Sequence, residues 1–130
     1  MTSVHWLVAT VLWTAVLWLP YVVERVVSGG LWPALDNPTA EPTKPAEWAR
    51  RAAAAHRNAL ENVPLFAGVV LSAAALGQAD APVIVLGAQV FFAARVLYTV
   101  IYIAGIPVVR TLAFTTGWVA LVGMSLSLLA

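Results

Sequence analysis

The chain has 130 residues, of which 62% are hydrophobic, while seven are basic and six are acidic. Soluble domains carry about 25% charged residues, so a chain with only 10% is not a soluble globule, and the same composition excludes intrinsic disorder. The net charge of +1 leaves no basic patch for nucleic acid, and the absence of cysteine excludes disulfides, thiolate metal sites and a thiol nucleophile of the protein's own.

The first apolar segment covers residues 4–23 and reaches the length of about 20 residues that a membrane-spanning helix needs. Glu24 and Arg25 close it, and Pro20 near its end is expected to kink the helix. No basic residue precedes this segment, and it is longer than the apolar region of a signal peptide. We therefore expect a retained first span, followed by a partly ordered loop over residues 28–47, which are rich in glycine and proline.

Three further apolar segments follow this loop. Residues 48–76 are polar in their first half and apolar in the second. Residues 81–104 start beside Pro82, a favourable residue for a helix start, and residues 108–129 form the last segment. We therefore predict an all-α integral membrane protein that consists of a single domain, a bundle of four spanning helices.

The basic residues predict the orientation of the spans, because cytoplasmic loops are enriched in lysine and arginine. Six of the seven basic residues flank two of the connections: Arg25, Lys44, Arg50, Arg51, Arg57 and Arg110. The other loop and both termini carry none. We therefore expect the loop 28–47 to be cytoplasmic and both termini to lie outside, in the inner membrane if the protein is bacterial.

Polar residues gather on one face of the second span. Charged groups inside a membrane are costly and usually mark function. Arg57 and Glu61 lie one turn apart on a stripe that begins at Arg50, and Asn58 lies beside this stripe. His56 points nearly away from it, so we assign no binding role to His56.

A second polar face belongs to the third span, where Arg95, Tyr98 and Tyr102 follow an i, i+3, i+7 spacing. Arg95 and Glu61 fall in the same half of the membrane, and Arg110 begins the fourth span at that surface. Because an unpaired charge in lipid is hard to sustain, we predict a structural ion pair between Glu61 and Arg95.

Two interpretations of these charges remain open. With Glu61 paired to Arg95, Arg57 and Arg110 are free to bind an anion, and the planar guanidinium suits a carboxylate. Alternatively, the charges only set the helix register, Arg110 anchors a helix end at the membrane surface, and the tyrosines belong to an interfacial aromatic belt.

Two stretches of the sequence resemble the MAPEG family, the membrane-associated proteins in eicosanoid and glutathione metabolism. The first is RAAAAHRNALENVPLF at residues 51–66, where a glutamate follows the asparagine by three residues and a proline comes shortly after. The second contains, in this order, Arg95, Tyr98, Tyr102, Gly105 and Arg110. The His-Arg-Asn order is most similar to the branch of microsomal glutathione transferases and prostaglandin E synthase-like proteins.

This resemblance implies a homotrimer of four-helix subunits, with glutathione as the cofactor between neighbouring subunits. The implied glutathione-binding residues are Arg57, Asn58, Glu61, Tyr98 and Tyr102. Arg110 is implied to be catalytic beside the glutathione thiol, and Thr111 follows it as a second catalytic residue. The expected activity is that of a transferase or peroxidase on lipophilic electrophiles or lipid hydroperoxides. The expected partners are other copies of the chain, membrane lipids and this hydrophobic substrate.

Two other functions remain open. Ala54 stands where active family members usually carry an arginine, and Phe114 where one branch carries a tyrosine. Both residues favour a non-enzymatic lipid- or fatty-acid-binding protein on the same fold. A small multidrug transporter also has four short spans, but such a pump needs a free intramembrane acid, and Glu61 has Arg57 one turn away.

Overall fold

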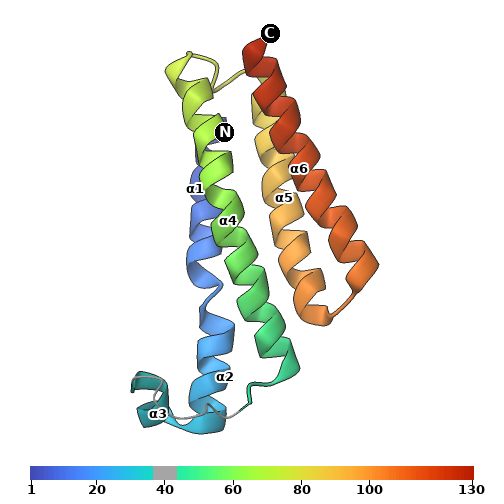
Figure 1. Cartoon of the computed structure of the whole chain (residues 1–130). Coiled ribbons are helices and arrows are strands. Elements are labelled where there is room, and N and C mark those ends of the chain that lie inside the picture. The colour runs from blue at the N-terminus through green and yellow to red at the C-terminus, as the bar shows by residue number, and fades with distance from the viewer. Residues whose placement is uncertain (37–43) are drawn as a thin grey trace.

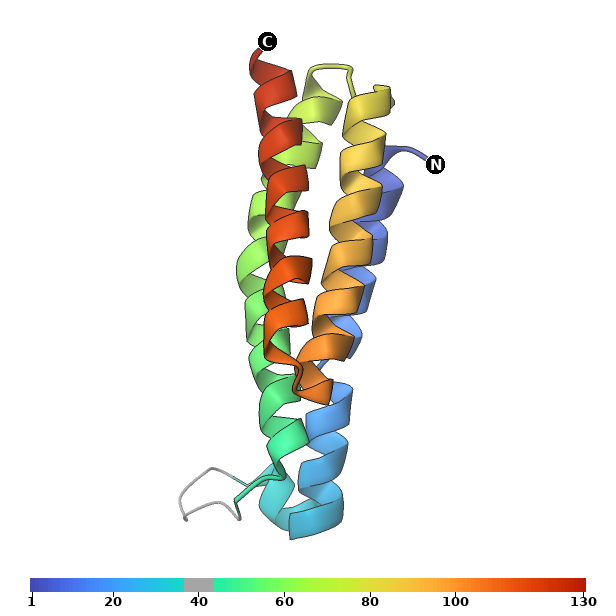
Figure 2. The same ribbon diagram turned by 90° about the vertical axis from the view of Figure 1, so that its right-hand side faces the viewer.

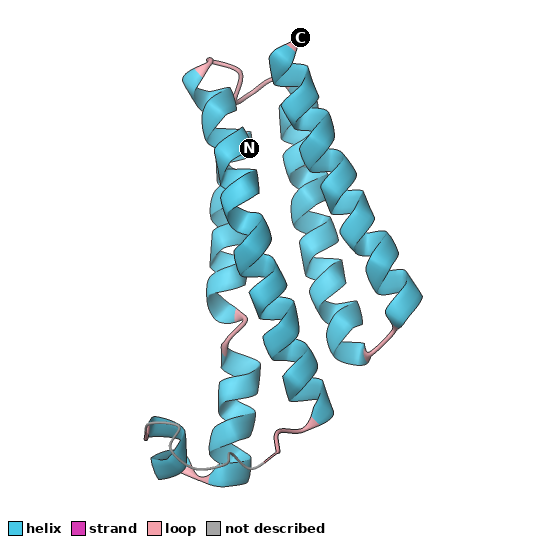
Figure 3. Ribbon diagram, in the orientation of Figure 1, coloured by secondary structure: helices cyan, strands magenta, loops and turns pink. Residues whose placement is uncertain are grey.

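The computed structural model describes residues 1–36 and 44–130, and this part of the chain contains helices and no strand (Figure 3). The helices, labelled in Figure 1, are α1 Ser3–Val16, α2 Leu19–Gly29, α3 Leu31–Leu35, α4 Glu47–Ala75, α5 Pro82–Ala104 and α6 Pro107–Leu129. Four stretches are long and apolar enough to cross a membrane: Ser3–Gly29, which joins α1 and α2, and the helices α4, α5 and α6. The prediction of an all-helical membrane protein with four apolar spans is confirmed.

The first span is broken near its middle. α1 ends at Val16 and α2 begins at Leu19, with Pro20 in the first turn of α2. A proline lacks a backbone N–H, and its ring collides with the carbonyl four residues earlier, which here belongs to Val16. The expected kink is therefore a break, and the helix then continues past residue 23 to Gly29.

The connection after the first span is partly helical, where we expected a loop over residues 28–47. α2 runs to Gly29, and Leu31–Leu35 form the short helix α3. Gly30 joins them with φ +90°, a conformation that residues with a side chain rarely adopt. Residues 37–43 of the expected loop lie outside the described residues.

Among the long helices α5 is central: it packs most extensively on α6, and it contacts both α4 and α1, which also contact each other (Figure 1). In the turned view α1 lies behind α5 (Figure 2). Both termini and the α4–α5 connection lie at one end, which we call the far end. The opposite end, which we call the polar end, contains α2, α3, the start of α4 and the α5–α6 turn.

The hydrophobic core lies toward the far end. Phe66 of α4 and Phe91 of α5 stack with 4.1 Å between ring centroids and 13° between ring planes, and both are buried. Around them pack Leu7, Val70, Ala73, Ile84, Ala88, Leu121 and Met124. Small residues let the helices approach, as interfaces inside membranes require. A Cβ on Gly87, for example, would lie 2.3 Å from Cγ of Met124.

Candidate functional site

Arg95 of α5 is buried between three helices, with only 3% of its surface exposed. Its Nη1 donates to Oδ1 of Asn58 on α4 at 3.3 Å, and its Nη2 donates to the carbonyl of Phe114 on α6 at 3.0 Å. Its Cζ lies 4.9–5.3 Å from the ring centroids of Phe91, Tyr98 and Phe114, within the range of cation–π attraction. This guanidinium therefore ties α4, α5 and α6 together within one chain.

The structural ion pair predicted between Glu61 and Arg95 is not present in this chain. Both hydrogen bonds of Arg95 end on neutral oxygens, and Glu61 is exposed on α4. Asn58 and Glu61 are three residues apart, so their side chains point about 60° apart around the helix. It is Asn58 that faces Arg95. Within residues 1–36 and 44–130, an ion pair instead joins Glu47 to Arg51 at 3.7 Å.

A glycine on α6 makes room for the buried guanidinium. A Cβ on Gly117 would lie 2.7 Å from Nη2 and 3.1 Å from Nε of Arg95. Arg95 is held by bonds to two other helices, so it cannot withdraw freely. The packing of α6 on α5 therefore depends on the absence of a side chain at this position.

Replacing Gly117 with alanine is expected to lower the free energy of unfolding by about 1–3 kcal/mol, because the added methyl group overpacks the Arg95 site. The measurement is the denaturation of purified protein in mixed micelles. The matched control is Gly123→Ala, where a Cβ meets nothing within 4 Å. Because alanine favours a helix over glycine, the control should be at least as stable as the wild type. Equal stability of the two variants would contradict the prediction.

Two tyrosines and a second arginine lie between Arg95 and the polar end. We call Arg95, Tyr98, Tyr102 and Arg110 together the polar cluster. The rings of Tyr98 and Tyr102 meet edge to face, with 5.4 Å between centroids and 66° between planes. Cζ of Arg110 lies 4.3 Å from the centroid of Tyr102. The structure thus brings together four residues predicted for the site, with the buried Arg95 at one end of the tyrosine pair and the half-buried Arg110 at the other.

The remaining predicted site residues are placed differently. Arg57 and Glu61 are exposed on α4, and no hydrogen bond or ion pair within the described part of the chain joins them to Arg110. The side-chain oxygen of Asn58 is held by Arg95. The hydroxyl of Thr111 donates to the carbonyl of Pro107 at 3.3 Å, one turn earlier in α6.

A cavity of about 570 Å³ lies between α2 and α4, and we call it the polar cavity. The charged residues that line it are Glu24, Arg25, Arg50 and Arg57. The carboxylate of Glu24 accepts a hydrogen bond from the backbone N–H of Ala46 at 3.1 Å, just before α4 begins. The cavity therefore has an excess of guanidinium groups and suits a ligand that carries carboxylates.

Two residues without an assigned role connect the helices at the polar end. His56 shares a hydrogen bond with Tyr21 of α2, with 2.9 Å between Nδ1 and the phenolic oxygen. Nε of Arg51 donates to the carbonyl of Ile103 at 2.8 Å, near the C-terminus of α5, where the helix dipole favours a cation. The sequence identified Arg51 only as one of several basic residues near this connection. It could not identify the Ile103 carbonyl as the acceptor, because every residue has a backbone carbonyl.

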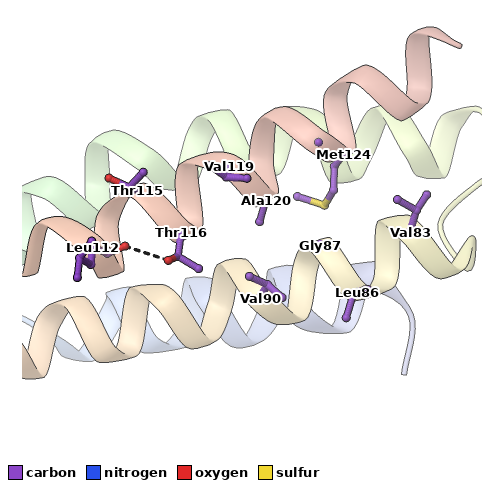
Figure 4. A pocket seen from close by; sticks show the side chains of 11 residues that line it. Val83, Leu86, Gly87, Val90, Leu112, Thr115, Thr116, Val119, Ala120 and Met124 are labelled. Carbon is purple, nitrogen blue, oxygen red and sulfur yellow. Dashed lines mark hydrogen bonds between the residues drawn. The ribbon is translucent and has the colours of Figure 1, made fainter. Parts of the chain in front are cut away.

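A second cavity, which we call the apolar groove, runs between α5 and α6 and has a volume of about 470 Å³ (Figure 4). It is lined by Val83, Leu86, Gly87, Val90, Leu112, Thr115, Thr116, Val119, Ala120, Gly123 and Met124. Charged side chains are absent from this lining. Arg110 is not among the lining residues. Leu112 follows it by two residues, which is about 200° around α6, so the two side chains lie on different faces of this helix.

Comparison with known proteins gives one match. The model of the MAPEG family matches residues 3–130 of the chain. This range covers every helix of the structure, and with them both polar faces and both cavities. The searches of curated proteins and of solved structures gave no match.

Proposed function

We propose a function from the premise that the chain belongs to the MAPEG family, which includes glutathione transferases and related membrane proteins. The chain is proposed to be a membrane-bound, glutathione-dependent transferase or peroxidase that acts on lipophilic electrophiles or lipid hydroperoxides. The observation that carries it is Arg110, half-buried at 4.3 Å from the Tyr102 ring. Within the described residues no acidic side chain pairs with this arginine, so its charge is available to an anion.

The charged groups of the chain fit glutathione, which has carboxylates, an ammonium group and a thiol. Arg25 and Arg57 in the polar cavity supply cations for the carboxylates. Glu61, exposed on the same helix as Arg57, supplies an acceptor for the ammonium group. Arg110 supplies a fixed cation for the sulfur. The absence of cysteine from the chain agrees with chemistry that uses the thiol of a cofactor.

Arg110 and Thr111 are the proposed catalytic residues. Bound glutathione would supply a thiol, which titrates at about pH 8.5 in peptides and ionises more readily near a cation. A guanidinium group offers only hydrogen-bond donors and no acceptor, so the proposed role of Arg110 is to stabilise negative charge and not to act as a base. Its Cζ lies over the Tyr102 ring, 4.3 Å from the centroid, and this cation–π contact helps to hold the charge in place. The hydroxyl of Thr111 can rotate away from the Pro107 carbonyl and donate to an anion beside Arg110.

We further propose that the site forms between the subunits of a homotrimer. Arg57 and Glu61 are exposed on α4, while Arg110 lies between α5 and α6. A neighbouring copy that presents its exposed α4 face would place its Arg57 and Glu61 near Arg110 and so complete the glutathione site. The basic residues at the polar end support a cytoplasmic location for that end, with both termini outside. The His56-Arg57-Asn58 order supports the microsomal glutathione transferase and prostaglandin E synthase-like branch.

The proposed function is tested with purified protein, glutathione and an aryl halide such as chlorodinitrobenzene. Thioether formation above the uncatalysed rate is expected, and glutathione should raise the midpoint of thermal unfolding because it binds the folded state. The absence of both effects would contradict the proposal. Oxidised glutathione, which has no free thiol, is the control for conjugation.

A second candidate function is lipid binding without chemistry. The apolar groove favours it, because the groove can hold an apolar molecule whether or not glutathione binds. Ala54 and Phe114 favour it too, since neither residue offers a polar group to a cofactor. A thermal shift with fatty acid but none with glutathione would select this function over the first.

A further inference from the structure

Three guanidinium groups line the polar cavity: those of Arg25 on α2 and of Arg50 and Arg57 on α4. In the part of the chain that the structure describes, no ion pair joins any of them to an acidic side chain. The lining also contains the carboxylate of Glu24, but its Oε1 already accepts a hydrogen bond from the backbone N–H of Ala46 at 3.1 Å. The cavity therefore offers positive charge to an anionic ligand.

Arg50 and Arg51 are adjacent in the sequence, but their side chains have different surroundings. Nε of Arg51 donates to the Ile103 carbonyl at 2.8 Å, and its Nη1 lies 3.7 Å from the carboxylate of Glu47. Successive residues of a helix point about 100° apart. Arg50 is exposed and lines the polar cavity, so it is the charge of Arg50 that is available to a ligand there.

Arg50, Arg57 and Glu61 form one stripe along α4. Their side chains fall within about 40° of one another around the helix axis. At 1.5 Å per residue, Arg50 precedes Arg57 by about 10.5 Å along the axis, and Glu61 follows Arg57 by about 6 Å. The stripe therefore has a cation at one end and a cation beside an anion at the other.

The two ends of glutathione differ in the same way. Its γ-glutamyl end carries an ammonium group next to a carboxylate, whereas its glycine end carries a carboxylate alone. An extended tripeptide spans about 10 Å, which matches the axial separation of Arg50 and Arg57. The end with both charges fits Arg57 and Glu61, and the glycine carboxylate fits Arg50, with Arg25 lining the same cavity.

We propose that Arg50 binds the glycine carboxylate of glutathione in the polar cavity and so makes the site selective for a ligand that carries this carboxylate. The inference rests on the proposed function and deepens it, because it assigns a further binding residue and an orientation to glutathione. Arg50 also supplies the charge that Ala54 lacks, since Ala54 lies one turn later and only about 40° away around α4.

The experiment measures the affinity of the purified full-length protein for glutathione and for glutathione ethyl ester, in which the glycine carboxyl group is esterified. Calorimetric titration in detergent gives both Kd values. The wild type should bind the ester about tenfold more weakly than glutathione, because the ester lacks one charge-assisted pair. Arg50→Ala should bind glutathione about tenfold more weakly than the wild type does, with an unchanged Kd for the ester. Equal weakening for both ligands, or no change for either, would overturn the proposal.

Two further variants test whether the position of the charge matters. Lys44→Ala removes an exposed cation that is not among the lining residues of the cavity, and both Kd values should stay unchanged. The double variant Arg50→Ala with Ala53→Arg returns a guanidinium group to the cavity lining, so most of the affinity for glutathione should recover. A tenfold loss in Lys44→Ala would mean that net charge alone attracts glutathione and would overturn the proposal.

Steady-state kinetics with an aryl halide separates this inference from the proposed function. Arg50→Ala should raise KM for glutathione about tenfold and leave kcat unchanged, because Arg50 binds the carboxylate and not the sulfur. A loss of kcat with an unchanged KM would overturn the proposal. If the wild type prefers glutathione to the ester but forms no thioether, the proposed function is wrong and Arg50 remains a binding residue. If the wild type does not bind glutathione, both proposals are wrong.

Discussion

Replacing Arg110 with alanine is expected to lower kcat/KM for glutathione conjugation about a hundredfold to a thousandfold, the usual cost of removing a fixed group that stabilises developing negative charge. Arg110 stacks on Tyr102, and within the described residues no carboxylate neutralises it. Its loss removes the cation that favours the thiolate. The measurement is the initial rate of thioether formation over a range of glutathione concentrations.

Two variants control this experiment. Arg110→Lys keeps the charge but loses the planar group that lies on the Tyr102 ring, so an intermediate loss of about tenfold is expected. Lys44→Ala removes an exposed cation at the polar end and should leave the rate unchanged. A wild-type rate in Arg110→Ala, from protein with a normal unfolding midpoint, would contradict the catalytic role of Arg110.

Truncating Phe66 to alanine is expected to lower the free energy of unfolding by about 3 kcal/mol, at the lower end of the range for a buried aromatic ring. Phe66 is fully buried and stacks on Phe91 at 4.1 Å, so its removal leaves a cavity between α4 and α5. In a membrane, helices associate mainly through such packing rather than through the hydrophobic effect. The measurement is unfolding in mixed micelles of increasing denaturing-detergent content.

The neighbouring residue provides the control for this prediction. Leu65 is 59% exposed, and Leu65→Ala removes a side chain of similar hydrophobicity from the outer face of the same helix. Its effect should stay within about 0.5 kcal/mol. Equal losses in the two variants would mean that the stack of Phe66 on Phe91 does not stabilise the bundle.

The four spans could be predicted because uninterrupted apolar length is sufficient evidence for a spanning helix. The break in the first span was predicted only as a kink, since its extent depends on how the chain relieves the contact between Pro20 and the Val16 carbonyl. The helix α3 was missed because Leu31–Leu35 contains a proline and is too short to show a period. Local patterns thus predict long elements better than the segments that join them.

The site was predictable where its residues share one helix or follow each other closely. Tyr98 and Tyr102 are four residues apart, so their contact follows from helix geometry. The partner of Arg95 could not be predicted, because choosing between Asn58 and Glu61 requires knowing how α4 is rotated toward α5. The bond from Arg51 to the Ile103 carbonyl was equally inaccessible, since every residue has such an acceptor.

The break between α1 and α2 separates two parts of the first span that would otherwise be mechanically coupled. An unbroken helix turns by about 100° per residue, so one inserted residue rotates everything beyond it. Here α1 keeps a buried stripe that includes Leu7, Thr10 and Thr14, while α2 buries no residue and is attached through contacts such as that of Tyr21 with His56. An insertion or deletion in α2 therefore need not rotate α1, and the buried residues of α1 continue to face the other helices.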